Sequence, residues 1–163
     1  MYNTEVGEFI VGAYLKVILN CDFVDYNIRP PGGGLGGLEE LDVLGLDFKN
    51  KSAYLCEVVT HIRGILYKNN RETIQRIRKK FERQKKYAKK HLQNFPNRFY
   101  MLWSPVVPRG NITENLEKYK DLELVINEKY SACIEQLREK ARVMTNDTGN
   151  PFFRMLQILE HLR

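Results

Sequence analysis

The spacing of apolar residues divides the chain into helical and extended segments. Apolar positions that recur every three or four residues predict five helices, over residues 4–20, 71–95, 111–119, 128–144 and 150–163. Short runs rich in β-branched and aromatic residues predict five strands, over residues 22–30, 38–47, 52–61, 97–105 and 122–126. The order α-β-β-β-α-β-α-β-α-α predicts an α/β fold, with a mixed sheet that opens as a meander and has helices on both faces.

The size of the chain fits one domain. With 163 residues and 43% hydrophobic content, it can bury a substantial core. We expect a single domain over 1–163, made of a core at about 4–127 and a C-terminal helical extension at about 128–163. The stretch PPGGGLGG at 30–37 reads as a flexible glycine loop, without the lysine and hydroxyl residue of a nucleotide-binding P-loop.

The composition argues against a secreted or membrane protein. No apolar run reaches the length of a membrane span, and the first residues, MYNTEVGEF, lack the pattern of a signal peptide. Three widely separated cysteines, Cys21, Cys56 and Cys133, fit neither a disulfide framework nor a cysteine-rich zinc site. We therefore expect reduced, buried thiols, a cytoplasmic location and no membrane partner.

Positive charge is concentrated in one predicted helix. Between Arg71 and Gln93 there are ten Lys and Arg residues against two acids, a local net charge of +8 in a chain whose net charge is +6. The rest of the chain is therefore slightly acidic. Such a concentration indicates a contact surface for a polyanion, with nucleic acid as the expected partner.

The second and third predicted strands each carry one acid among apolar residues, Asp42 and Glu57. A symmetric turn centred between Lys49 and Asn50 places these acids directly opposite each other, with Cβ atoms roughly 4.5–5.5 Å apart. Like charges at that separation repel, and a divalent cation such as Mg²⁺ removes the conflict. The alternative is a three-residue loop, which puts the two carboxylates on opposite faces, each in solvent.

The element order and the two acids together resemble the PD-(D/E)XK nuclease superfamily. The segment EELDVLGLD is similar to the family strand that carries the metal-binding Asp, and LCEVVTH is similar to its Glu-X-Lys strand. The resemblance covers residues 4–103 and implies a restriction-endonuclease-like αβββαβ core. It also implies an acid on the first helix, a place that Glu8 or Glu5 can fill.

The chain departs from the family motif at one position, because Val59 stands where the lysine is expected. One alternative is that the lysine has moved to the basic helix, where Lys80 and Gln84 are best placed to reach the acids. A second is that His61 substitutes for it. A third is that catalysis is lost and a nucleic-acid-binding module remains.

The resemblance implies a metal-dependent endonuclease that hydrolyses phosphodiester bonds, with DNA as the expected substrate. Asp42, Glu57, the carbonyl of Val58 and Glu8 would hold Mg²⁺ or Mn²⁺. Lys80 or Gln84 would position water or stabilise charge. Nucleic-acid contacts are expected from seven basic residues: Arg63, Arg76, Lys79, Lys80, Arg83, Lys86 and Lys90.

Two other readings of the sequence stay open. The chain can be a catalytically inactive nucleic-acid-binding module on the same fold, or a protein-interaction module whose basic helix meets an acidic partner. An apolar stripe in the last predicted helix either closes the core or joins two subunits in a homodimer. Its members are Phe152, Met155, Leu156, Leu159 and Leu162.

Overall fold

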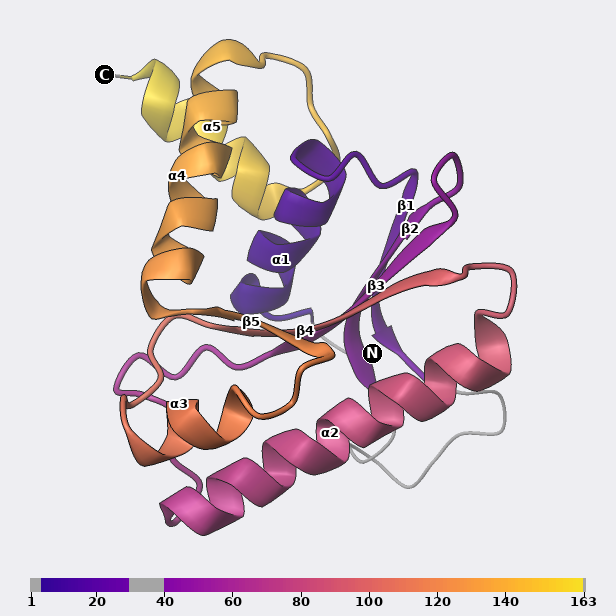
Figure 1. Cartoon of the computed structure of the whole chain (residues 1–163). Helices are drawn as coiled ribbons and strands as arrows, with labels where there is room; N and C mark the ends of the chain where they lie inside the picture. The colour runs from indigo at the N-terminus through magenta and orange to yellow at the C-terminus, as the bar shows by residue number, and fades with distance from the viewer. Residues whose placement is uncertain (1–3, 30–39, 163) are drawn as a thin grey trace.

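The computed structural model describes residues 4–29 and 40–162. In this part of the chain a five-stranded sheet lies between two layers of helices (Figure 1). The helices are α1 (Val6–Val17), α2 (Asn70–His91), α3 (Asn111–Leu116), α4 (Asn127–Val143) and α5 (Pro151–His161). The strands are β1 (Phe23–Ile28), β2 (Leu41–Asp47), β3 (Ser52–Val58), β4 (Asn97–Ser104) and β5 (Leu122–Ile126).

The strands lie in the sheet in the order in which they occur in the chain. The pairs β1–β2 and β2–β3 are antiparallel, whereas β3–β4 and β4–β5 are parallel. Each parallel pair needs a crossover, which α2 and α3 supply. The predicted α/β class, the opening meander and the mixed sheet with helices on both faces are confirmed.

One face of the sheet is covered by α1, α4 and α5 (Figure 1). The core on this face joins α1, α4 and the sheet, and its largest members include Val11, Leu15, Val43, Trp103 and Tyr130. Gly12 lets α1 approach closely, because a Cβ atom there would collide with the Tyr26 ring of β1. The C-terminal helices therefore pack on the same layer as α1.

The other face of the sheet is covered by α2 and α3 (Figure 1). The helix α2 buries Thr73, Ile77, Phe81, Gln84 and Ala88, which recur at helical spacing. At the start of the helix Thr73 is buried, whereas its apolar neighbour Ile74 is only half-buried. The Thr73 hydroxyl accepts a hydrogen bond from the Tyr67 backbone N–H, which fixes the start of the helix.

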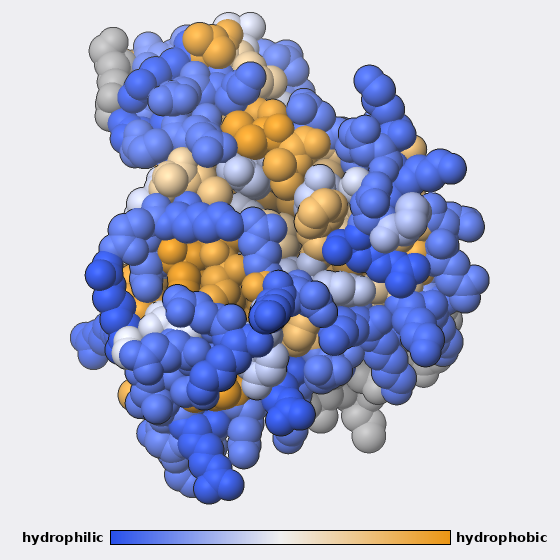
Figure 2. Space-filling view, in the orientation of Figure 1, coloured by the Kyte–Doolittle hydropathy of each residue, from blue (hydrophilic) through white to orange (hydrophobic). Residues whose placement is uncertain are grey.

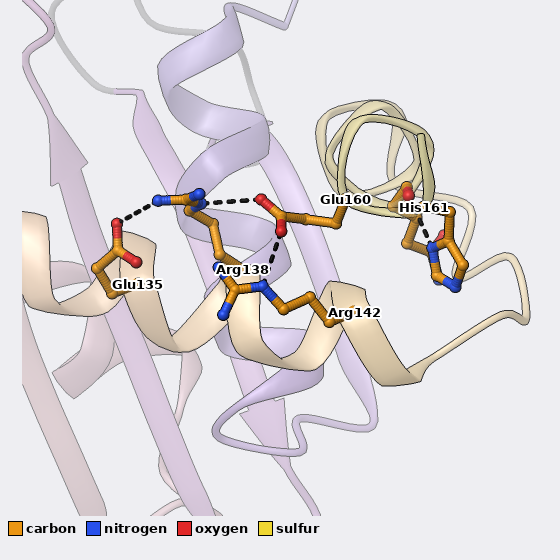
Figure 3. Close-up of polar contacts among 6 residues, drawn as sticks. Glu135, Arg138, Arg142, Glu160 and His161 are labelled. Carbon is orange, nitrogen blue, oxygen red and sulfur yellow. Dashed lines mark hydrogen bonds and ion pairs between the residues drawn. The ribbon is translucent and has the colours of Figure 1, made fainter. Parts of the chain in front are cut away.

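A polar cluster fastens α5 to α4 (Figure 3). The buried Glu160 carboxylate accepts hydrogen bonds from Arg138 Nε at 2.9 Å and Arg142 Nε at 2.8 Å. Arg138 also pairs with Glu135. A buried carboxylate is tolerated here because two guanidinium groups compensate its charge.

Several predicted boundaries differ from the structure. The first helix has Glu5 rather than Thr4 as its N-cap, and the Glu8 side chain accepts a hydrogen bond from the Glu5 backbone N–H. The third strand ends at Val58, three residues before His61. The glycine loop at 30–37 and the predicted strand start at 38–39 lie outside the described residues.

Two expectations from composition concern the cysteines and membrane-spanning helices. The three cysteines are buried and have no disulfide partner, as predicted. Within the described ranges, no helix combines the length and apolar character that crossing a lipid bilayer requires.

Candidate active site beside strands β2 and β3

The two acids of the hairpin stand opposite each other. The pairing of β2 with β3 runs from Asp47–Ser52 to Val43–Cys56, and one further step pairs Asp42 with Glu57. Both acids lie on the α2 face, because Leu44 and Leu55, two residues away on each strand, pack with Ala88 of that helix. The alternative of a three-residue loop is therefore wrong.

The hairpin turn is held by hydrogen bonds to one carboxylate. Asp47 accepts these bonds from the backbone N–H and the side-chain amide of Asn50. Lys51 is the left-handed residue of the turn, with φ of 51°. Four residues thus close the turn symmetrically, which preserves the register of the acids.

Asp42 is half-buried and bound to the adjoining strand. Its Oδ2 accepts a hydrogen bond from the backbone N–H of Val58 at 2.7 Å. Burial raises the pKa of the Asp42 carboxyl, and the positive charges of Lys80 and Arg83 oppose that rise. The buried negative charge is therefore only partly compensated, and a further positive charge nearby would stabilise the anionic form.

Lys80 of α2 reaches the acid pair. Its ammonium group forms an ion pair with Glu57 Oε1, and the side chains are 28% and 6% exposed, respectively. Burial lowers the pKa of Lys80, while the Asp42 charge raises it. A lysine from the basic helix thus contacts one acid of the pair.

Val59 cannot take that role. It is 5% exposed and packs with Ile65, Ile77 and Phe81 in the apolar core under α2. Its backbone N–H bonds to the Trp103 carbonyl oxygen, so β3 is held against β4 up to this point.

Gln84 has a different place from the one expected. Its side chain is 1% exposed, and its Nε2 donates to the carbonyl oxygens of Leu55 at 2.9 Å and Met101 at 3.3 Å. It therefore anchors α2 to β3 and β4, and the structure does not bring it to the carboxylates. His61 also lies elsewhere, with its ring against Tyr67 at 5.6 Å.

Glu8 lies near Asp42 but is engaged in other bonds. Its Oε2 accepts hydrogen bonds from the Glu5 backbone N–H at 2.9 Å and from Asn27 Nδ2 at 3.0 Å. Burial raises the pKa of Glu8, and the negative charge of Asp42 adds to the rise. In residues 4–29 and 40–162, no three His, Cys, Asp or Glu side chains form a group that could hold a metal ion.

Asn27 is a neighbour of the site that the sequence did not indicate. It falls between the pairs Tyr26–Val43 and Ile28–Leu41, and so opposite Asp42. Its φ of 53° is left-handed, a conformation that Asn tolerates better than most residues. This local turn of the strand accompanies the hydrogen bond to Glu8. The sequence carries no signal for it beyond the residue type.

The basic residues of α2 form a continuous polar band, which is mostly blue in Figure 2. Arg76, Lys79, Lys86 and Lys90 are exposed, whereas Lys80 and Arg83 are half-buried on the side of the acids. Arg76 lies 4.6 Å from the centre of the Tyr67 ring. Arg63 is exposed in the turn after β3.

A pocket of about 140 Å³ lies along α2 and includes Leu41, the residue before Asp42, in its lining. It lies between the second half of α2 and the start of β2, and its lining residues are Glu40, Leu41, Arg83, Lys86, Tyr87, Lys90 and His91. The sequence did not indicate that the start of β2 closes one side of a cavity, or that Tyr87 and His91 line it.

Comparison of the chain with protein-family models, curated proteins and solved structures gives no match.

Proposed function

We propose that this chain is a metal-dependent nuclease that hydrolyses phosphodiester bonds in nucleic acid, with DNA as its expected substrate. The main support for the proposal is the opposed pair Asp42 and Glu57 on adjacent strands. Lys80 of α2 forms an ion pair with Glu57 at this place. These residues adjoin a helix with ten basic residues, which can hold the backbone of a polyanion.

The strand order supports the proposed restriction-endonuclease-like topology. An antiparallel β1–β2–β3 meander followed by α2 and a parallel β4 has the αβββαβ order that the motif resemblance implies. The acids lie on the second and third strands, where the resemblance expects them.

The carboxylates fit a hard divalent cation. Mg²⁺ commonly uses one or two protein carboxylates, with water and substrate phosphate as its other ligands. The raised pKa of Asp42 indicates that Lys80 and Arg83 compensate its buried charge only in part. Asp42, Glu57 and the Val58 carbonyl would hold Mg²⁺ or Mn²⁺, and Glu8 would join through water.

The bound cation would supply Lewis acidity toward a phosphate oxygen and toward water. Asp42 and Glu57 would fix the position of the site on two adjacent strands. Lys80, paired with Glu57, would offer positive charge to the phosphate as negative charge develops there. Arg83 adds a second positive charge, which also lowers the pKa of Asp42.

The proposal is tested by cleavage of supercoiled plasmid and of labelled DNA and RNA with Mg²⁺, with Mn²⁺ and with EDTA. We expect cleavage with metal only, and a loss of at least about a hundredfold in Asp42→Asn and in Glu57→Gln, because each removes a charged ligand and retains the shape. Glu139→Gln, an exposed acid of α4 on the opposite face of the sheet, is the matched control. Absence of cleavage with both metals, or full activity in Asp42→Asn, would refute the nuclease.

One observation favours a second candidate, a catalytically inactive nucleic-acid-binding module. The motif lysine is replaced by a buried valine, and Lys80 is engaged with Glu57. This candidate predicts salt-sensitive binding without cleavage under any metal. An acidic protein partner, the third reading, predicts no affinity for either nucleic acid.

A further inference from the structure

The pocket beside the acid pair combines aromatic rings with positive charge. The rings of Tyr87 and His91, one helical turn apart on α2, have centres 4.7 Å apart and planes tilted by 40°. Tyr87 is half-buried and packs against the apolar cluster beneath α2, while His91 is exposed at the end of the helix. One ring is therefore held firmly, and both rings line the cavity.

The charge of the pocket is positive. Arg83, Lys86 and Lys90 line it together with one acid, Glu40. Glu40 is paired with Arg29 at 3.2 Å, so its negative charge is offset by a cation from outside the pocket lining. Aromatic faces inside a positively charged groove are the features with which proteins bind single-stranded nucleic acid.

We propose that this pocket binds an unpaired nucleotide, with its base against Tyr87 and His91 and its phosphates at Arg83, Lys86 and Lys90. The substrate is then a single strand, or a duplex with a single-stranded extension. This inference rests on the proposed function for its nucleic-acid ligand and deepens it by naming the substrate class.

A paired base does not meet these requirements. Bases inside a duplex are stacked on their neighbours and must be extruded before a protein can contact their faces, which costs free energy. An unpaired base enters a recessed cavity without that cost. The rings therefore give the pocket a preference that the exposed lysines of α2 alone cannot provide, because phosphate contacts alone favour the more highly charged duplex.

The pocket is also connected to the acid pair. Arg83 lines the cavity, and Lys80, about one helical turn before it on α2, pairs with Glu57. From Lys80 to Tyr87 the helix rises by about 10 Å, or two turns. A strand held in the pocket would thus continue along one face of α2 toward Asp42 and Glu57.

The test is binding in EDTA, where no cleavage occurs, measured by fluorescence anisotropy with a labelled single strand and a blunt duplex of equal length. We expect the single strand to bind more tightly by about tenfold, the scale of one base–aromatic stack. Tyr87→Leu should remove most of this preference and Tyr87→Phe should retain it, because the phenyl ring still stacks. Phe99→Leu, an exposed aromatic on β4, is the matched control.

A second readout follows the base itself. A single strand with 2-aminopurine at one position should lose fluorescence on binding to the native protein, and less so with Tyr87→Leu. Thermal unfolding checks that this variant folds. If Tyr87→Leu does not fold, His91→Ala, at the exposed end of α2, gives the same test.

Equal affinity for both forms, or unchanged preference in both Tyr87→Leu and His91→Ala, would overturn the inference and leave the nuclease proposal intact. A single-strand preference without metal-dependent cleavage would have the opposite meaning. It would support nucleotide binding in the pocket and contradict the nuclease proposal. No binding to either nucleic acid would remove both.

Discussion

At the scale of single residues, the structure differs from the motif in the position of one lysine. In the motif the lysine follows Glu57 by two residues, but Val59 belongs to an apolar cluster beneath α2. A lysine there would have to carry its charge out of this cluster, which is costly. Lys80 enters from α2 instead and reaches Glu57 with part of its side chain in solvent.

Lys80→Met should raise the pKa of Asp42 further. Burial already raises that pKa, and the positive charge of Lys80 is the largest influence that lowers it. Removal of this charge leaves the anionic form less stable, so the carboxyl keeps its proton to a higher pH. The shift can be measured from the carboxyl carbon resonance of Asp42 during a pH titration without metal.

Lys79→Met is the control for this titration. Lys79 is the preceding residue on α2, but its side chain is exposed. An equal shift in both variants would mean that the effect is the net charge of the helix and not contact at the site. An unchanged Asp42 titration in Lys80→Met would contradict the geometry described here.

At the scale of elements, α2 does two tasks with two faces. Its buried face fastens the sheet through Ile77, Phe81 and Ala88, and Gln84 adds hydrogen bonds to two strands. Its outer face carries the positive charge. The helix begins where Asn69 caps it, since the Asn69 side chain accepts a hydrogen bond from the Glu72 backbone N–H.

The outer face of α2 should set the salt dependence of binding to duplex DNA. Six phosphate contacts give a slope of log affinity against log salt near about −5. Lys79→Gln combined with Lys86→Gln should make the slope less steep by about 2, because two contacts are lost. The measurement is anisotropy over a series of salt concentrations.

The matched control removes the same charge from the opposite side of the molecule. Lys16 on α1 and Lys140 on α4 are exposed, and the double change to Gln should leave the slope as it is. If both double variants change the slope equally, the net charge of the protein and not α2 governs binding.

At the scale of the whole molecule, the C-terminal helices complete the layer that α1 begins. Phe153 and Leu156 of α5 pack with Ala13, Leu137 and Ala141. Met155, Ile158, Leu159 and Leu162 remain more than half exposed. The apolar stripe expected from sequence is thus divided between the core and the surface, and the homodimer stays a prediction.

Asn150 joins three elements and should be important for stability. Its Oδ1 accepts from the Phe153 N–H and caps α5, while its Nδ2 donates to the Phe9 carbonyl and the Tyr26 hydroxyl. Asn150→Ala should lower the free energy of unfolding by about 2 kcal/mol through the lost cap and the unpaired Phe9 carbonyl. Urea denaturation can be followed by fluorescence of the single, buried Trp103.

Asn150→Ser separates the two contributions, because its hydroxyl retains the cap and the change removes both donated bonds. Its loss of stability should lie between those of the native protein and Asn150→Ala. Asn94→Ala, at an exposed position after α2, should stay within about 0.5 kcal/mol of the native protein. Native stability in Asn150→Ala would show that α5 is held by its apolar contacts alone.

The sequence by itself determined the order of the elements and the concentration of positive charge in α2. These depend on local properties: the period of apolar residues and the charge of one helix. The hairpin left two registers open, and the structure selects the one in which Asp42 and Glu57 stand opposite each other. Only the tertiary structure decided that Val59 is core, that Lys80 and not Gln84 meets the acids, and that Tyr87, His91 and β2 enclose a pocket. Those outcomes depend on how far α2 lies from the sheet and how it is rotated, which is set by packing between segments distant in the chain.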